Sequence, residues 1–139
     1  MIRPARGKRV KSPMTLHPSS AHDRLIARLL SGPKKAEAMK WLRNANAAEE
    51  RTIGRRRTTG TSARLVKKLY DFGACQVLAA QIHRAGNGAG QHTGKLVVEL
   101  PKDLKRRRAI FEWCRKQGES LGHSPDVDQG QDYLFLLLD

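Results

Sequence analysis

The residues of this chain that are best suited to chemistry are its clustered arginines and lysines. Guanidinium groups present pairs of N–H donors that match phosphate oxygens, and several such contacts together give binding that ignores base sequence and weakens with salt. The clusters lie near the N-terminus, in a polar stretch before a helix, on that helix, and in the first turns of a second helix. The predicted nucleic-acid-binding residues are Arg3, Arg6, Lys8, Arg9, Lys11, Arg55, Arg56, Arg57, Lys67, Lys68, Lys105, Arg106, Arg107 and Arg108.

The histidines and cysteines give a weaker signal. Neither residue type shows the spacing of a metal site or of an activated nucleophile. Cys75 and Cys114 fall on expected core-facing positions of a strand and a helix, where cysteine acts as a small hydrophobic residue. His83 and His92 flank a glycine-rich loop and are expected to approach each other across it, so a chemical role for this pair stays open. We predict no catalytic residue and no metal site.

Two loops resemble ligand-binding motifs only in part. The stretch from Gly86 to Lys95 lacks the glycine that a phosphate-binding loop needs at position 89, and it leads into a strand instead of a helix. Asp126, Asp128 and Asp132 do not match the ligand positions of a calcium loop. No cofactor is predicted.

The positive charge is unevenly distributed. The 139 residues have a formal net charge of +14. Residues 1–68 contain 18 Lys and Arg against 4 Asp and Glu, whereas residues 69–139 contain 9 of each. No apolar run approaches the length of a membrane-spanning helix, and two cysteines do not make a disulfide framework. These features favour a nucleic-acid partner, no membrane, and by default a cytoplasmic location.

The first third of the chain divides into two parts. Residues 1–20 are basic, free of acidic residues and interrupted by prolines, which predicts a disordered arm. An organellar targeting segment has a similar composition, although no clear amphipathic helix is visible here. Residues 21–48 predict a helical hairpin, with one helix to about Leu30 and a second from Pro33 to about Ala48.

Residues 49–139 predict one α+β domain with a strand, helix, strand, strand, helix, strand order. The expected elements are a strand at 51–55, a helix at 61–72, strands at 75–82 and 95–100, a helix at 101–121 and a strand at 133–138. This is the order of a ferredoxin-like βαββαβ sandwich with a four-stranded antiparallel sheet. Two helices cover only one face of such a sheet, so the N-terminal helices or a second copy must cover the other.

Three functional hypotheses follow. The first is a non-enzymatic protein that binds RNA, or a ribonucleoprotein, through backbone phosphates, because no DNA-reading motif is visible. The aromatic residues that RNA-recognition domains place on their central strands are missing here, so base stacking on the sheet is disfavoured. The second is a protein-interaction or regulatory module that uses the apolar sheet face, with a homodimer as one form of it. The third, an enzyme built on His83 and His92, lacks a recognisable set of catalytic groups.

Overall fold

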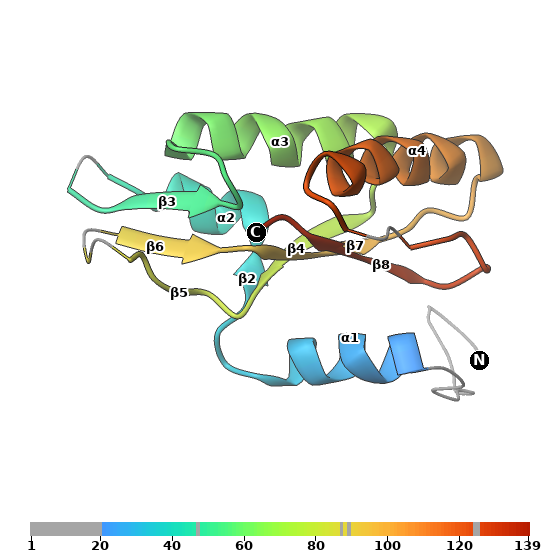
Figure 1. The fold of residues 1–139 in the computed structure, drawn as a ribbon, viewed down its shortest axis with the longest axis horizontal. Coiled ribbons are helices and arrows are strands. Elements are labelled where there is room, and N and C mark those ends of the chain that lie inside the picture. Colours follow the sequence, from blue (N-terminus) through green and yellow to red (C-terminus); the bar gives the residue numbers. More distant parts are fainter. Residues whose placement is uncertain (1–20, 47, 87, 89, 124–125) are drawn as a thin grey trace.

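A four-stranded sheet forms the centre of the structure, and helices lie on both of its faces (Figure 1). The structure, a computed structural model, describes residues 21–46, 48–86, 88, 90–123 and 126–139. Its elements are α1 (Ala21–Ser31), β2 (Ala36–Glu37), α2 (Ala38–Arg43), β3 (Glu50–Ile53), α3 (Thr59–Phe72), β4 (Gln76–Ala80), β5 (His83–Arg84), β6 (Gly90–Thr93), β7 (Lys95–Glu99), α4 (Leu104–Ser120) and β8 (Tyr133–Leu137). The mixed α+β class predicted from the sequence is confirmed. No helix in these ranges combines the length and the apolar character needed to cross a bilayer.

The strands form two sheets. The larger sheet has the order β2-β4-β7-β8 and is antiparallel throughout. The smaller sheet has the order β3-β6-β5, in which β3 runs parallel to β6. The two sheets meet where β6 leads into β7, and Gly54 N–H donates to the Thr93 carbonyl at 2.9 Å beside that junction.

The strand expected around Ile53 does not join the larger sheet. A ferredoxin-like sandwich has all four strands of its βαββαβ unit in one sheet, so that finer assignment is not confirmed. The reason lies in Gly90, within the stretch expected to be only a hairpin loop. A Cβ at Gly90 would lie 2.1 Å from the Glu50 carbonyl oxygen, so glycine allows the backbone of β3 to pair with β6.

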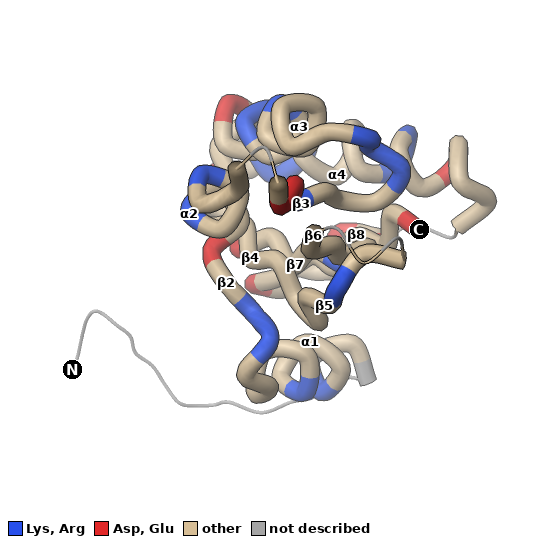
Figure 2. The backbone as a smooth tube through the Cα atoms, turned by 90° about the vertical axis from the view of Figure 1, so that its left-hand side faces the viewer, with Lys and Arg blue, Asp and Glu red and all other residues tan. Residues whose placement is uncertain are grey.

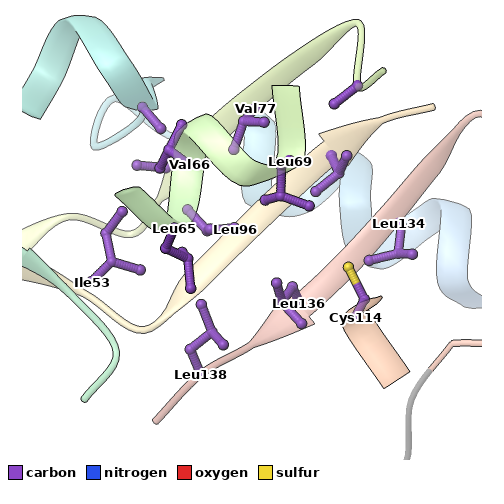
Figure 3. Close-up of a cluster of buried hydrophobic side chains, with 14 of the residues drawn as sticks. Ile53, Leu65, Val66, Leu69, Val77, Leu96, Cys114, Leu134, Leu136 and Leu138 are labelled. Carbon is purple, nitrogen blue, oxygen red and sulfur yellow. The ribbon is translucent and has the colours of Figure 1, made fainter. Parts of the chain in front are cut away.

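The principal core lies between the larger sheet and the layer of α3 and α4 (Figure 3). Thr58 caps the start of α3 through a capping box with Thr61, and Gly73 ends the helix in the left-handed region at φ 113°. Leu65, Val66 and Leu69 then point from α3 into the core. The sequence predicted this helix at 61–72, so its end before Gly73 is confirmed, whereas its start lies two residues earlier than expected, at Thr59.

The two N-terminal helices do not pack as a hairpin. Ile26 and Leu29 of α1 pack against Ala80 and Val97 on one face of the larger sheet, whereas α2 joins the core on the other side. The second helix is also shorter than expected, because it ends at Arg43 and a turn follows. In that turn the Asn46 side chain accepts hydrogen bonds from the N–H groups of residues 48 and 49, both at 2.9 Å.

The face of the larger sheet opposite α3 and α4 is therefore covered in cis, by α1 (Figure 1). The sequence left two candidates for this role, the N-terminal helices or a second copy. Val97 and Ala80 are fully buried beneath α1. The apolar surface on which the homodimer hypothesis depended is thus occupied by the chain itself.

Candidate nucleic-acid interface

Arg55, Arg56 and Arg57 lie in a tight turn between β3 and α3. The turn depends on Gly54, which has φ 60° and would place a Cβ 2.6 Å from Leu138 Cβ. Arg55 and Arg57 are exposed, while the Arg56 guanidinium donates to Gln117 Oε1 of α4 at 3.4 Å. The turn therefore presents the exposed Arg55 and Arg57 at the N-terminal end of α3, and neither forms an ion pair within the part of the chain that the structure describes.

The outer side of α3 carries three exposed cations, Arg64, Lys67 and Lys68. Lys67 pairs with Asp71 at 2.9 Å, and both side chains are largely in solvent, so the pair contributes little to stability. Lys68 Nζ lies 5.9 Å from the centroid of the Phe72 ring. Among the described residues, no carboxylate pairs with Arg64 or Lys68.

The basic run at the start of α4 divides into two kinds of residue. Lys105, Arg106 and Arg108 are exposed, whereas Arg107 is buried. The Arg107 guanidinium donates to Asp128 Oδ1 at 2.7 Å and to the carbonyls of Pro101 and Gln131 at 3.2 and 3.0 Å. Its donors are occupied within the fold, so we leave Arg107 out of the interface proposed below.

The pKa of Asp128 supports a structural role for Arg107. The hydrogen bond from the guanidinium, followed by one from the Gly130 N–H, lowers the pKa of the Asp128 carboxyl below its ordinary value. The two residues hold the loop before β8 against α4. Asp103 has a separate local role, because its side chain caps α4 by accepting from the Arg106 N–H at 2.9 Å.

Exposed cations lie in the turn before α3, on α3 itself and at the start of α4. Arg106 marks the far end, because a Cβ on Gly73, which ends α3, would lie 2.7 Å from Arg106 Cδ. The 14 residues of α3 span about 21 Å from the arginine turn to this point. We call this surface the cation track. It consists of Arg55, Arg57, Arg64, Lys67, Lys68, Lys105, Arg106 and Arg108.

The hairpin histidines meet as the sequence predicted. His83 and His92 are paired in register between β5 and β6, with ring centroids 5.5 Å apart. His92 is held on both sides, by Thr52 Oγ1 at 2.9 Å from Nδ1 and by Asp139 Oδ1 at 3.1 Å from Nε2. With both ring nitrogens engaged, His92 is not poised for proton transfer to a substrate. The described residues contain no group of three or more His, Cys, Asp or Glu side chains that could hold a metal ion.

The sequence placed one cysteine correctly and one wrongly. Cys114 is buried in the core, and burial raises the pKa of its thiol to about 12, so it is an inert core residue at neutral pH. Cys75 is exposed, not core-facing as expected, because it precedes the first residue of β4. Burial, together with the nearby Glu99, raises the pKa of the Cys75 thiol as well.

Three cations that line one cavity of the structure were not among the predicted site residues. Lys34 and Lys35, between α1 and β2, and Arg84 on β5 line one cavity although they are distant in the sequence. Their proximity depends on the pairing of β2 with β4, which no local pattern predicted. Conversely, the five cations of the N-terminal arm lie outside the described residues.

The fold and the cation track together define a mixed α+β protein with a strongly basic helical surface. Comparison of this chain with protein families, characterised proteins and solved structures found no match. Function must therefore be argued from the surface itself.

Proposed function

We propose that this protein binds nucleic acid, with RNA favoured over a specific DNA site, and that it does so without catalysis. The observation that carries the proposal is the cation track along α3, in which exposed Lys and Arg side chains lie over about 21 Å. Each strand of a duplex carries one phosphate per about 3.4 Å along the duplex axis, so a track parallel to that axis spans roughly six phosphates of one strand. A row of cations of this length suits a nucleic-acid backbone.

The track supports reading of the backbone instead of the bases. It consists of Lys and Arg, and the aromatic ring beside it, Phe72, lies near the Lys68 ammonium and packs against the core. Cations at the start of α4 also oppose the helix dipole, at a cost of a few tenths of a kcal/mol each. Helix stability therefore does not explain their placement, and a polyanionic partner does.

Two further expectations belong to this proposal. The basic arm, residues 1–20, adds phosphate contacts to those of the track through Arg3, Arg6, Lys8, Arg9 and Lys11. A cytoplasmic location fits a chain with so few cysteines and an RNA partner.

The test uses fluorescence anisotropy with labelled duplex RNA, single-stranded RNA and duplex DNA across a salt series. For the full chain we expect a log–log salt slope of about −4 to −5 on a duplex, from four to six phosphate contacts. Replacing the five arm cations with Gln should weaken binding without abolishing it. Failure of the full chain to bind any of the three probes near physiological salt would refute the proposal.

Matched double variants locate the interface. Lys68→Ala with Arg108→Ala removes one lysine and one arginine from the cation track, and should make the duplex slope shallower by about 1.8. Lys40→Ala with Arg43→Ala removes the same charges from exposed positions on α2 and serves as the control. Equal effects of the two pairs would show that net charge, not the track, determines binding.

A further inference from the structure

A basic groove lies away from the cation track, beside the segment that connects α1 to β2. One cavity of about 420 Å³ is lined by Lys34, Lys35 and Trp41 together with Ile82, Arg84 and Gln91. A second cavity of about 370 Å³ adjoins it and shares Pro33, Lys34 and Ile82. We call the two together the connector groove.

The walls of the connector groove are positively charged. Neither cavity has an Asp or Glu in its lining, whereas Arg28, Lys34, Lys35 and Arg84 all contribute. Figure 2 shows this distribution, with Lys and Arg on the connection from α1 to β2, on β5 and on α1. Among the described residues, no carboxylate forms an ion pair with Lys34 or Arg84. The lining therefore has a net positive charge that attracts an anion.

The floor of the groove is apolar, and Trp41, at its base, is 5% exposed and belongs to the core. The Trp41 indole N–H donates to Gln91 Oε1 at 2.7 Å, so the polar atom of the ring already has its partner. The Ile82 N–H donates to the Lys34 carbonyl at 2.9 Å and ties the two walls together. Because these bonds lie within the protein, the groove is formed before any ligand arrives.

The backbone at one end of the groove is in an uncommon conformation. Gln81 has φ 52°, and it is the only residue other than glycine with a positive φ in the described part of the chain. This residue turns the chain from β4 into β5 and so places Arg84 on the groove wall. Backbone strain of this kind is retained where the surrounding structure enforces it, and it concentrates at binding sites.

From these observations we propose that the connector groove binds a short stretch of single-stranded nucleic acid. Phosphates lie on Lys34, Lys35 and Arg84. A base lies on the exposed ring of His83, which also lines the groove, beside Ile82. Cationic walls combined with an aromatic residue are the features by which proteins hold single strands. The inference rests on the proposed nucleic-acid binding but uses a different surface, because no residue of the cation track lines the groove.

The test measures the fluorescence of Trp41 in Trp113→Phe protein, where it is the only tryptophan. The ligands are adenosine monophosphate, a four-residue oligoadenylate and a short RNA duplex. We expect the oligoadenylate to change the Trp41 emission and to bind more tightly than the monophosphate. Anisotropy of a labelled oligoadenylate gives the same comparison in protein that keeps Trp113.

Variants then separate the groove from the track. Lys34→Ala with Arg84→Ala should weaken oligoadenylate binding by roughly tenfold and make its salt slope shallower by about 1.4, because each single-strand phosphate contact contributes about 0.7. Lys40→Ala with Arg43→Ala removes the same charges outside the groove lining and should have a smaller effect.

Three results would overturn the groove proposal. They are an unchanged Trp41 signal with the oligoadenylate, equal losses in the two double variants, and binding of the monophosphate as tightly as the oligomer, which would indicate a site for a free nucleotide. The proposed function fails separately, when the full chain binds no RNA or DNA. Duplex binding that depends on Lys68 and Arg108 would persist if only the groove proposal is wrong.

Discussion

Arg107 and Arg108 are neighbours in sequence, yet the structure gives them opposite roles, and that difference can be measured. Arg107→Ala removes two hydrogen bonds to carbonyl oxygens and an ion pair with Asp128. Bonds from a charged donor are worth about 1.5 kcal/mol each at the low end of their range. The Asp128 side chain is 39% exposed, so we assign the ion pair about 1 kcal/mol or less. The expected loss is about 3–4 kcal/mol in the free energy of unfolding.

The control is Arg108→Ala, because Arg108 is exposed and has no ion pair among the described residues. Its stability should stay within about 0.5 kcal/mol of the parent protein. Urea unfolding followed by circular dichroism measures both variants, and the midpoint is compared at constant slope.

The same two variants are then tested for RNA binding at a temperature where both remain folded. Arg108→Ala should make the duplex salt slope shallower by about 0.9, while Arg107→Ala should leave it unchanged. A loss of stability below 1 kcal/mol for Arg107→Ala, or a reduced salt slope for that variant, would refute the assignment of Arg107 to the fold.

Other predictions concern the elements that position the two surfaces. Gly54→Ala should lower the free energy of unfolding by at least about 1–3 kcal/mol, because φ is 60° and the new Cβ would lie 2.6 Å from the leucine that follows β8. Gly88→Ala, at φ 75° with open space around it, measures the cost of the dihedral angle alone in the same thermal melts. Burial alone would raise the pKa of Glu37, but hydrogen bonds from Tyr70 and from backbone N–H groups outweigh it and leave the pKa below 4.5. Glu37 therefore stabilises the fold above about pH 4.5 and loses this effect as the pH falls through its lowered pKa. Glu37→Gln should lower the free energy of unfolding by about 1 kcal/mol near neutral pH, and this deficit should shrink on acidification. A constant deficit from pH 7 to pH 3 would contradict this. Ile26→Ala should cost about 2–4 kcal/mol and increase the binding of a hydrophobic dye, because this residue is 3% exposed beneath the larger sheet; unchanged urea unfolding would show that α1 is not needed there.

The sequence predicted best those elements whose signals are local. Gly73 ends α3 as expected, and the helix begins at Thr59, two residues before the predicted start. It failed for β3, because the partner of this strand is fixed by Gly90, where close backbone approach and not side-chain alternation determines the pairing. A loop of glycines and polar residues has no period that would reveal a strand.

The candidate binding residues also divide into those that local sequence predicts and those that depend on the fold. The sequence identified the basic run of α4, but only burial separates Arg107 from its exposed neighbours, and burial depends on Asp128 and on a loop about 20 residues further along the chain. The connector groove could not be predicted at all, since Lys34 and Arg84 meet through the β2 and β4 pairing and through an unusual backbone angle at Gln81.

The arrangement of the two surfaces constrains how one nucleic acid could use both. The cation track follows α3 and the start of α4 above the larger sheet, while the connector groove lies beside α1, β2 and β5 (Figures 1 and 2). A rigid duplex on the track cannot also bend into the groove without a large deformation, since its persistence length is about 150 base pairs. A duplex that ends in a single strand meets no such barrier, because unpaired nucleotides turn freely at the junction. Such a junction should therefore bind more tightly than the duplex or the single strand alone, and a gain that vanishes with Lys34→Ala and Arg84→Ala would link the two surfaces in one complex.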